Sequence, residues 1–259
     1  MTNPGLIVED RGAARWITLD RPDCRNGLTP PLVAALCEAV RSASTARVIA
    51  FAGRNDAFCS GLDLRVAAEF GPQLTANMED HITAFQDIIR AIVQAPQPVV
   101  AVLDGPSAGF GSDLALACDL RIASTRATFQ ETFVRIGVIP DGGGSWMLPR
   151  LVGLSKALEL ILLGEKVDAA TALQLGLVYK VVPPERLAEE SEALVARLAA
   201  GAPMALQRAK RLARRSLETD FDTGLKGECA GQAECLRSED VMEGVMAFFQ
   251  KRPPQFQGK

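Results

Sequence analysis

The sequence predicts an α/β fold in two parts: a β/α body over residues 1–180 and a helical C-terminal region over residues 181–259. Short apolar segments alternate with longer segments whose apolar residues recur at helical spacing, and glycine-bearing turns follow two of the short segments. From Leu154 onward the pattern is almost wholly helical. Within this part, Asp168 is predicted to cap a short helix that ends at Gly176.

Strands and helices alternate in the first half of the body. Leu6–Glu9 and Arg15–Asp20 are predicted to pair as strands, because both are rich in β-branched or aromatic residues and a glycine lies between them. Pro30–Ala43 has apolar residues at helical spacing and prolines at its start, which predict a helix. Arg47–Gly53 is typical of a short buried strand, and Thr75–Gln94 is typical of a helix.

The second half of the body repeats this order. Pro98–Leu103 is apolar throughout, as expected of a strand that is covered on both faces. A glycine-rich turn at Gly105–Gly111 leads into a predicted helix over Asp113–Cys118. Leu120–Ala123 is predicted to be the next strand, and the glycines of Ile136–Gly144 indicate a loop.

The composition indicates a globular protein of the cytoplasm. Apolar residues make up 48% of the chain, charged residues 23%, and the net charge is −3, without the basic face that a nucleic-acid partner would require. The N-terminal residues 1–4 do not begin a signal peptide, and no apolar run is long enough to cross a membrane. With six scattered cysteines, no CxxC pair and a single histidine, His81, we expect reduced thiols and no metal site.

Two turns carry the pattern that points to chemistry. Ser60–Asp63 follows one buried strand and Gly105–Gly111 follows another, and glycine allows a ligand to approach the backbone closely. The second turn also opens a helix, whose first N–H groups lack internal partners. If the two turns meet, their amides form an oxyanion hole, in which one donor contributes roughly 3–4 kcal/mol of transition-state stabilisation.

Carboxylates stand near these turns in sequence. Asp113 lies in the first turn of the predicted helix, and Asp141 stands between a proline and three glycines. Amides that hold an enolate, with a carboxylate that moves a proton, are what carbon-acid chemistry beside a carbonyl requires. Structural roles stay open, since Asp113 could only complement its helix N-terminus and Asp141 could only cap a helix near Ser145. Glu131 is expected to be solvated or ion-paired.

A serine hydrolase is a weaker interpretation of the same segment. Gly105–Gly109 matches GxSxG, with Ser107 as the nucleophile, and lies between a strand and a helix. That fold needs a histidine after the serine, whereas His81 precedes it. The chain therefore cannot supply the three groups in the required order.

Three segments together resemble the consecutive signature blocks of the crotonase (enoyl-CoA hydratase/isomerase) superfamily. They are AFCSGLDL, PVVAVLDGPSAGFGSDLALACDLRIAS and IGVIPDGGGSWMLPRLVG, and RPDCRNGLT and FFQKRPPQF resemble its early and C-terminal blocks. The resemblance covers nearly the whole chain. It implies an α/β crotonase-like spiral of ββα units with a C-terminal helical trimerisation region, and a homotrimer or dimer of trimers.

The resemblance also implies site residues. The oxyanion amides fall on Leu62 and Phe110, Asp141 is the main acid/base, and Asp113 is a second acid/base or an orienting group. Coenzyme A enters only as part of the acyl-CoA substrate, and no metal or other cofactor is implied. The residues implied to bind the substrate are Arg25, Asn26, Ser60, Gly61, Leu62, Asp63, Leu64, Arg65, Gly109, Phe110, Phe133 and Lys251, the last of them a phosphate contact across a subunit boundary.

Departures from the family pattern favour one activity. Hydratases of the family use two glutamates, and these positions hold Asp113 and Phe133 here. Pro140-Asp141 resembles members that shift a double bond with one aspartate, and a single carboxylate can both remove and return the proton. We therefore expect isomerisation of an enoyl-CoA thioester. The alternatives are hydration by Asp113 and Asp141 together, a dehalogenase with nucleophilic Asp141, which lacks the family's tryptophan at Phe133, and a non-catalytic acyl-CoA binder.

Overall fold

A six-stranded sheet forms the centre of the molecule in the computed structural model, which describes residues 5–65 and 78–259. The prediction about residues 1–4 and the start of the helix predicted from Thr75 lie outside the described residues. All neighbouring strands run parallel except the first pair. In spatial order the strands are β1 (Leu6–Arg11), β2 (Ala14–Leu19), β3 (Val48–Gly53), β4 (Val99–Leu103), β6 (Leu120–Ser124) and β9 (Lys180–Val182).

A second, three-stranded sheet is built from short segments that follow the strands of the first. It contains β5 (Pro106–Ala108), β7 (Thr128–Gln130) and β8 (Lys166–Asp168). Cys59, in the loop after β3, joins it by a bridge to Ser107. The chain therefore repeats one unit: a strand of the large sheet, a short strand of the small sheet, then a helix.

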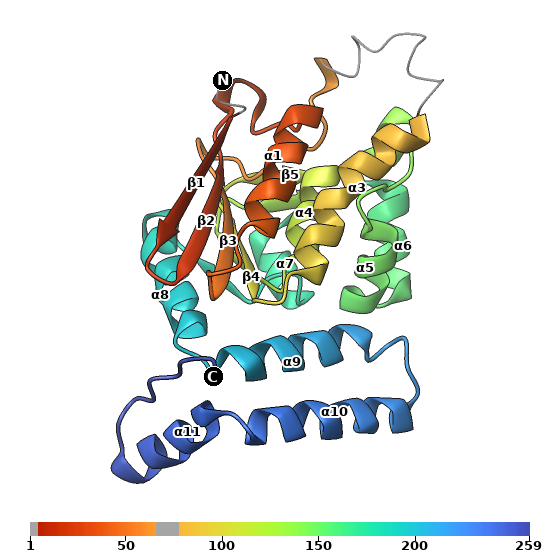
Figure 1. Cartoon of the computed structure of the whole chain (residues 1–259). Coiled ribbons are helices and arrows are strands. Elements are labelled where there is room, and N and C mark those ends of the chain that lie inside the picture. The colour runs from red at the N-terminus through yellow and green to blue at the C-terminus, as the bar shows by residue number, and fades with distance from the viewer. Residues whose placement is uncertain (1–4, 66–77) are drawn as a thin grey trace.

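Helices cover both faces of the large sheet (Figure 1). Those on the first face include α1, α3 and α4, and α8 lies on the other face. Among the described residues, no helix is long and apolar enough to span a bilayer. The helices are α1 (Pro30–Arg41), α3 (Met78–Gln94), α4 (Phe110–Ala117), α5 (Gly144–Val152), α6 (Leu154–Leu163), α7 (Ala169–Gln174), α8 (Leu187–Ala199), α9 (Pro203–Arg215), α10 (Phe221–Leu236) and α11 (Glu239–Gln250), with short 3-10 turns η1 (Pro22–Cys24), η3 (Phe133–Ile136) and η4 (Pro184–Arg186).

The apolar strands form two cores because alternate side chains face opposite sides of the sheet. Ile49 and Phe51 pack under α1, α3 and α4, whereas Val48 and Ala50 pack under α8. Every residue of β4 is buried, which confirms the prediction of a strand covered on both faces.

The last three helices, α9–α11, form an arm beside the body (Figure 1). Asp119, at the end of the loop before β6, holds α9 through Lys210 Nζ at 2.7 Å and Arg214 Nη2 at 2.7 Å. These two ion pairs fix the direction in which the arm leaves the body.

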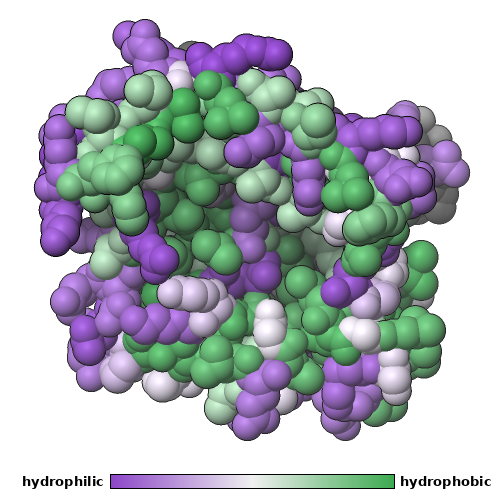
Figure 2. All heavy atoms as spheres, turned by 90° about the horizontal axis from the view of Figure 1, so that it is seen from below, coloured by the Kyte–Doolittle hydropathy of each residue, from purple (hydrophilic) through white to green (hydrophobic). Residues whose placement is uncertain are grey.

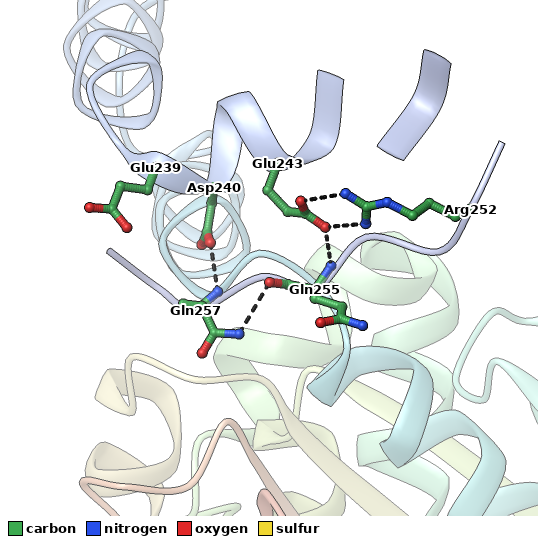
Figure 3. Close-up of a pocket in the computed structure, with 6 residues that line it drawn as sticks. All are labelled: Glu239, Asp240, Glu243, Arg252, Gln255 and Gln257. Carbon is green, nitrogen blue, oxygen red and sulfur yellow. Dashed lines mark hydrogen bonds and ion pairs between the residues drawn. The ribbon is translucent and has the colours of Figure 1, made fainter. Parts of the chain in front are cut away.

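The C-terminal tail returns along the start of α11 (Figure 3). The Asp240 carboxylate accepts the amide N–H groups of Gln257 at 2.6 Å and Gly258 at 2.9 Å. Glu243 accepts from Arg252, whose guanidinium lowers the pKa of Glu243 to about 2. Arg47, just before β3, donates to the Phe256 carbonyl at 2.8 Å, so the tail also contacts the body.

The sequence pattern missed the shortest strands. The glycine-rich turn at 105–111 contains β5, and β8 and β9 interrupt the region after Leu154 that was predicted to be helical. Strands of three residues are too short to show a period of two. The helix predicted from Asp113 begins earlier, at Phe110, whereas the N-cap prediction for Asp168 is confirmed by its bond from Thr171 N–H at 2.8 Å.

Candidate active site

The two glycine-bearing turns meet. A methyl group built on Gly61 would lie 2.8 Å from the Ala108 carbonyl oxygen and 3.3 Å from the Phe110 nitrogen. One built on Gly111 would lie 2.2 Å from the Cys59 carbonyl oxygen. Such distances are shorter than side-chain contacts allow, so the close approach of the two backbones requires glycine at both positions. At Gly61 the φ of 85° adds a second reason.

The hydrogen-bonding pattern directs the Leu62 amide toward the second turn. Leu28 pairs with this segment by donating to the Gly61 carbonyl at 2.7 Å and accepting from the Asp63 amide at 2.9 Å. Because alternate peptide groups point to opposite sides of an extended chain, the Leu62 N–H points away from Leu28. The Phe110 N–H opens α4 and has no partner within that helix. Neither amide donates to another residue in the described ranges.

Asp113 lies beneath a loop of three glycines. Its side chain is fully buried, and its Oδ2 accepts the Gly142 amide at 2.9 Å. Methyl groups built on Gly142 and Gly144 would lie 2.7 Å and 2.3 Å from the two Asp113 carboxylate oxygens. The glycine run, a weak signal in the sequence, is thus what lets the loop close over this carboxylate.

Asp141 stands at the start of that loop and is half-buried. Its Oδ1 is buried and has no hydrogen-bond partner among the described residues. Its backbone carbonyl accepts from Gln86 Nε2 of α3 at 3.0 Å, and the adjacent Phe85 packs edge-on against the Phe110 ring at 5.6 Å. Neighbouring residues of α3 therefore contact both Phe110 and Asp141, which places the aspartate on the side of the second turn.

Glu131 corrects a prediction. The sequence led us to expect a solvated or ion-paired side chain. In the structure Glu131 is 5% exposed, and no ion pair within the described residues includes it. Its Oε2 is buried without a partner and lies 3.3 Å from a methyl group built on Gly144, the glycine that also approaches Asp113. Asp113, Glu131 and Asp141 together form what we call the carboxyl cluster.

Burial raises the pKa of each member of the carboxyl cluster. It raises the pKa of Asp113 to about 7, an effect opposed by the Gly142 amide and increased by the charge of Asp141. The pKa of Glu131 rises to about 9, first through burial and then through the charges of both aspartates. The pKa of Asp141 is also raised by burial. The N-cap alternative for Asp141 is wrong, because Gly143 is the N-cap of α5. Asp113 does lie in the first turn of α4, as its structural alternative requires, and it also accepts the Gly142 amide from outside that helix.

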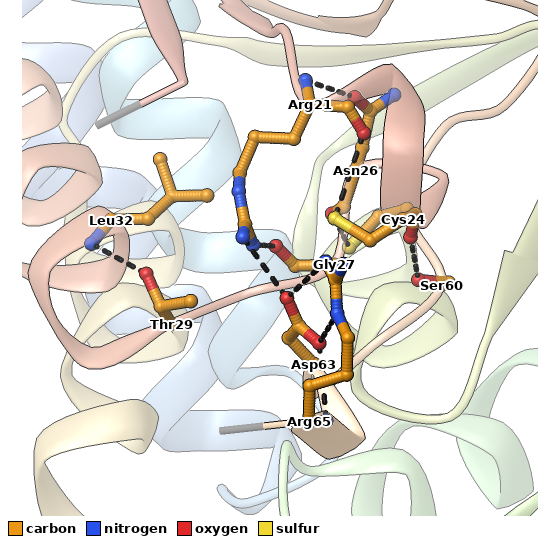
Figure 4. Close-up of polar contacts among 10 residues, drawn as sticks. Arg21, Cys24, Asn26, Gly27, Thr29, Leu32, Ser60, Asp63 and Arg65 are labelled. Carbon is orange, nitrogen blue, oxygen red and sulfur yellow. Dashed lines mark hydrogen bonds and ion pairs between the residues drawn. The ribbon is translucent and has the colours of Figure 1, made fainter. Parts of the chain in front are cut away.

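Ion pairs between Asp63 and two arginines stabilise the first turn (Figure 4). The Asp63 carboxylate, 5% exposed, pairs with Arg21 Nη2 at 3.0 Å and with Arg65 Nη2 at 2.9 Å. The two arginines hold the pKa of Asp63 well below its ordinary value, through the Arg65 hydrogen bond above all. Arg21 was not singled out in the sequence, where it appears only as an arginine before a proline.

The loop implied to bind CoA is shaped by Asn26. Its Nδ2 donates to the carbonyls of Arg54 at 3.0 Å and Ala57 at 2.8 Å. Its Oδ1 accepts from the Arg21 amide at 2.9 Å (Figure 4). Both side-chain donors of Asn26 are thus used inside the protein. Arg25 beside it is exposed, in a left-handed conformation at φ 50°.

The remaining residues that the resemblance implies lie either at the two turns or on the arm. Ser60 donates to the Cys24 carbonyl at 2.8 Å and ties the two loops together, and Leu62 and Leu64 are exposed. Lys251 is the C-cap of α11, on the arm and outside the group formed by the two turns. The Phe133 ring lies 3.8 Å from a methyl group built on Gly109, so it borders the second turn, and its side chain cannot transfer protons.

Ser107 does not behave as a nucleophile. Its side chain is 1% exposed, and its hydroxyl donates to the Thr128 carbonyl at 3.0 Å. A serine that is buried and engaged in this way does not present its oxygen to a substrate. Within residues 5–65 and 78–259, no three histidine, cysteine or acidic side chains are grouped as metal ligands would be.

The structure thus combines repeated strand–strand–helix units with two neighbouring glycine-bearing turns and a set of adjacent, buried carboxyl groups. The family model described as enoyl-CoA hydratase/isomerase matches residues 9–259. The chain belongs to this family, the crotonase superfamily, and has its fold of ββα units followed by C-terminal helices.

Named relatives differ in activity. A probable enoyl-CoA hydratase of Rhodobacter capsulatus is 38% identical over 94% of both chains. The 1,2-epoxyphenylacetyl-CoA isomerase of Escherichia coli is 35% identical, again over 94% of both. The crystal structure of an enoyl-CoA hydratase from Bacillus anthracis superposes with a TM-score of 0.93 at 31% identity, covering 98% of this chain and 100% of that one. Hydration and isomerisation thus both occur among proteins this similar.

Proposed function

We propose that the protein isomerises an enoyl-CoA thioester by moving its double bond. The Asp141 carboxylate removes a proton from the carbon beside the thioester carbonyl, and the electron pair moves onto the thioester oxygen. The N–H groups of Leu62 and Phe110 hold the enolate that forms. The Asp141 carboxylic acid then returns its proton two carbons away, and the double bond moves into conjugation with the carbonyl.

One observation carries this proposal: Asp141 is the half-buried carboxylate with an unpartnered oxygen on the side of the two amides. Asp113 is fully buried beneath the glycine loop, which suits an orienting group better than a group that meets the substrate. Phe133, at the second acid position of hydratases, has no proton to give. A single proton-transferring carboxylate is sufficient for a bond shift.

Hydration is the second candidate, and the pKa of Asp113 favours it. A carboxyl group with a pKa of about 7 can act as acid or base near neutrality, so Asp113 and Asp141 together could hold and deliver water. This route requires Asp113 to reach the substrate beneath the loop. The hydratase names of several relatives fit it as well.

Incubation with a panel of short and medium enoyl-CoA esters separates the two reactions. Bond migration leaves the mass of the ester unchanged, whereas hydration adds the mass of one water. We expect β,γ-unsaturated esters to become α,β-unsaturated without a gain of mass. Conversion of α,β-unsaturated esters to hydroxyacyl-CoA, with no bond migration, would replace the isomerase proposal with the hydratase one.

For substrate binding, we propose that the exposed turn at Leu62–Arg65 lines the acyl-thioester path and that Arg25 lies beside the nucleotide. Asn26, Ser60 and Asp63 serve by shaping these loops, because their polar atoms are already used within the protein. The distance of Lys251 from the turns fits a contact with a substrate bound to another subunit. The family's chemistry and the free cysteines support a cytoplasmic location.

We also propose a homotrimer or a dimer of trimers. Large apolar side chains are exposed on the arm, including Phe221 at 78%, Phe248 at 78% and Phe249 at 75%. Figure 2 shows hydrophobic side chains gathered around a hollow on the face seen from below. Apolar surface of this kind is covered in a stable protein, and further copies of the chain would cover it.

A further inference from the structure

Glu131 is the member of the carboxyl cluster that the proposed reaction leaves without a role. It precedes η3 and is held among apolar side chains on one side and the Asp113 carboxylate on the other. A small cavity of about 10 Å³ borders it, room for on the order of one water molecule. The cavity is lined mainly by Leu116, Phe129, Leu148, Leu160, Val167 and Leu177.

Unpartnered oxygens of Asp113 and Glu131 lie near the same glycine, Gly144. Asp113 Oδ1 and Glu131 Oε2 each lack a hydrogen-bond partner among the described residues. A methyl group built on Gly144 would lie 2.3 Å from Asp113 Oδ1 and 3.3 Å from Glu131 Oε2. Two ionised carboxylates would repel one another here, whereas a proton between them would satisfy both oxygens.

We propose that Glu131 is a positioning residue that stays protonated and shares its proton with Asp113, so that the cluster keeps a hydrogen bond in place of a second buried charge. This role rests on the proposed function, because Glu131 would support the proton transfer that is assigned to Asp141. A neutral Glu131 fixes the Asp113 carboxylate beneath the glycine loop. It also keeps negative charge away from the place where the enolate becomes negative.

The surroundings of Glu131 agree with a neutral group. The titratable groups nearest it are Asp113 on α4 and Asp141 before α5, both acidic. Glu165 borders the same cavity but is exposed, and Arg135 lies by the Glu131 backbone carbonyl at Gly164. No cation pairs with the Glu131 carboxyl group within the described residues, and its raised pKa, about 9, follows from this environment.

Glu131→Gln tests the proposal, because glutamine keeps the shape and a donor but cannot ionise. We expect its kcat near neutrality, measured with a β,γ-unsaturated hexenoyl-CoA, to stay close to that of the wild type. The wild-type kcat should fall at alkaline pH as Glu131 ionises, and the Glu131→Gln variant should lack this decline. Glu165→Gln, at the exposed side of the cavity, is the matched control and should decline as the wild type does. Glu131→Leu, which cannot donate, should lose up to roughly 100-fold in kcat through misplaced groups.

Infrared difference spectroscopy of Glu131→Gln against the full-length wild type gives a readout independent of turnover. The carbonyl stretch of a protonated carboxylic acid should be present in the wild type at neutral pH and absent from the variant. Absence of that band would show that Glu131 is ionised. Either that result or a folded Glu131→Gln variant that is inactive at every pH would overturn the proposal. An active Asp141→Asn variant would instead remove the proposed function and leave the infrared result standing.

Discussion

Gly61 determines whether the two amides can meet. An alanine there would place its methyl group 2.8 Å from the Ala108 carbonyl oxygen and would strain a backbone with φ 85°. We expect Gly61→Ala to separate the turns and lower kcat by roughly 100- to 1,000-fold, the loss typical of one oxyanion donor. Steady-state kinetics with circular dichroism to confirm folding measure this effect.

Gly224→Ala is the matched control for that substitution. Gly224 lies within α10, where an added methyl group meets nothing within 4 Å. Its kcat should equal that of the wild type. A Gly61→Ala variant as active as the control would mean that the amides do not form the oxyanion hole.

Glu131 also gives the protein a pH-dependent stability. Its pKa is about 9 in the folded protein against an ordinary value of 4.5, so between these values the folded state binds a proton that the unfolded state has lost. The free energy of unfolding therefore falls as the pH rises through this window, by at most about 1.4 kcal/mol per pH unit for one proton. Glu131→Gln removes this contribution.

Urea unfolding of the wild type and of Glu131→Gln, at about pH 5 and about pH 8, measures the effect. The stability of the variant relative to the wild type should increase with pH. A difference that stays constant would indicate that Glu131 has the same pKa in both states.

At the scale of elements, two cations of α9 contact the body through one acidic residue and through the backbone carbonyls of Gln97 and Ala117. Asp119 pairs with Lys210, whose side chain is 9% exposed, and with Arg214. Asp119→Ala would remove the carboxylate partner of both cations and leave them only the carbonyls of Gln97 and Ala117, and it is expected to lower the free energy of unfolding by about 2–4 kcal/mol. Denaturant unfolding measures it, with Asp87→Ala, which removes an exposed ion pair with Arg90 on α3, as the control. Equal losses in the two variants would contradict a special role for Asp119.

The longer elements could be predicted from the sequence because their apolar patterns are long enough to show a period. β3, β4, α1 and the N-cap at Asp168 appear where the pattern placed them, within a few residues. β7 lies within TFQETF (residues 128–133), a segment whose composition is strand-like, whereas β5, β8 and β9 are not evident in the pattern, since their partners lie far away in sequence and three residues carry no periodicity.

The carboxyl cluster was predicted in part. Asp113 and Asp141 stand in recognisable glycine-rich surroundings, whereas Glu131 was expected at the surface. A signal was present: Phe129, Glu131 and Phe133 alternate with more exposed residues, so all three belong to the inward face. The close approach of the turns that hold Leu62 and Phe110 could not follow from the spacing alone, because it depends on how β3 and β4 lie side by side.

At the scale of the whole molecule, the exposed phenylalanines of the arm predict association. Phe248→Glu combined with Phe249→Glu would place charges on the apolar surface and should yield monomers by light scattering coupled to size-exclusion chromatography. Val8→Glu, at a 44% exposed position on the edge strand β1, is the control and should keep the assembly of the wild type. A double variant that assembles as the wild type does would exclude this surface as the contact.

The central claim is that the amides of two distant turns hold an enolate while Asp141 moves its proton. Exchange of the α-protons of a β,γ-unsaturated hexenoyl-CoA in deuterated water, followed by mass spectrometry, tests it most directly in the wild type and in Asp141→Asn. We predict rapid exchange in the wild type and a loss of roughly 100- to 10,000-fold in the variant, with ester binding nearly unchanged. Exchange at the wild-type rate in Asp141→Asn would contradict the assignment of the proton to Asp141.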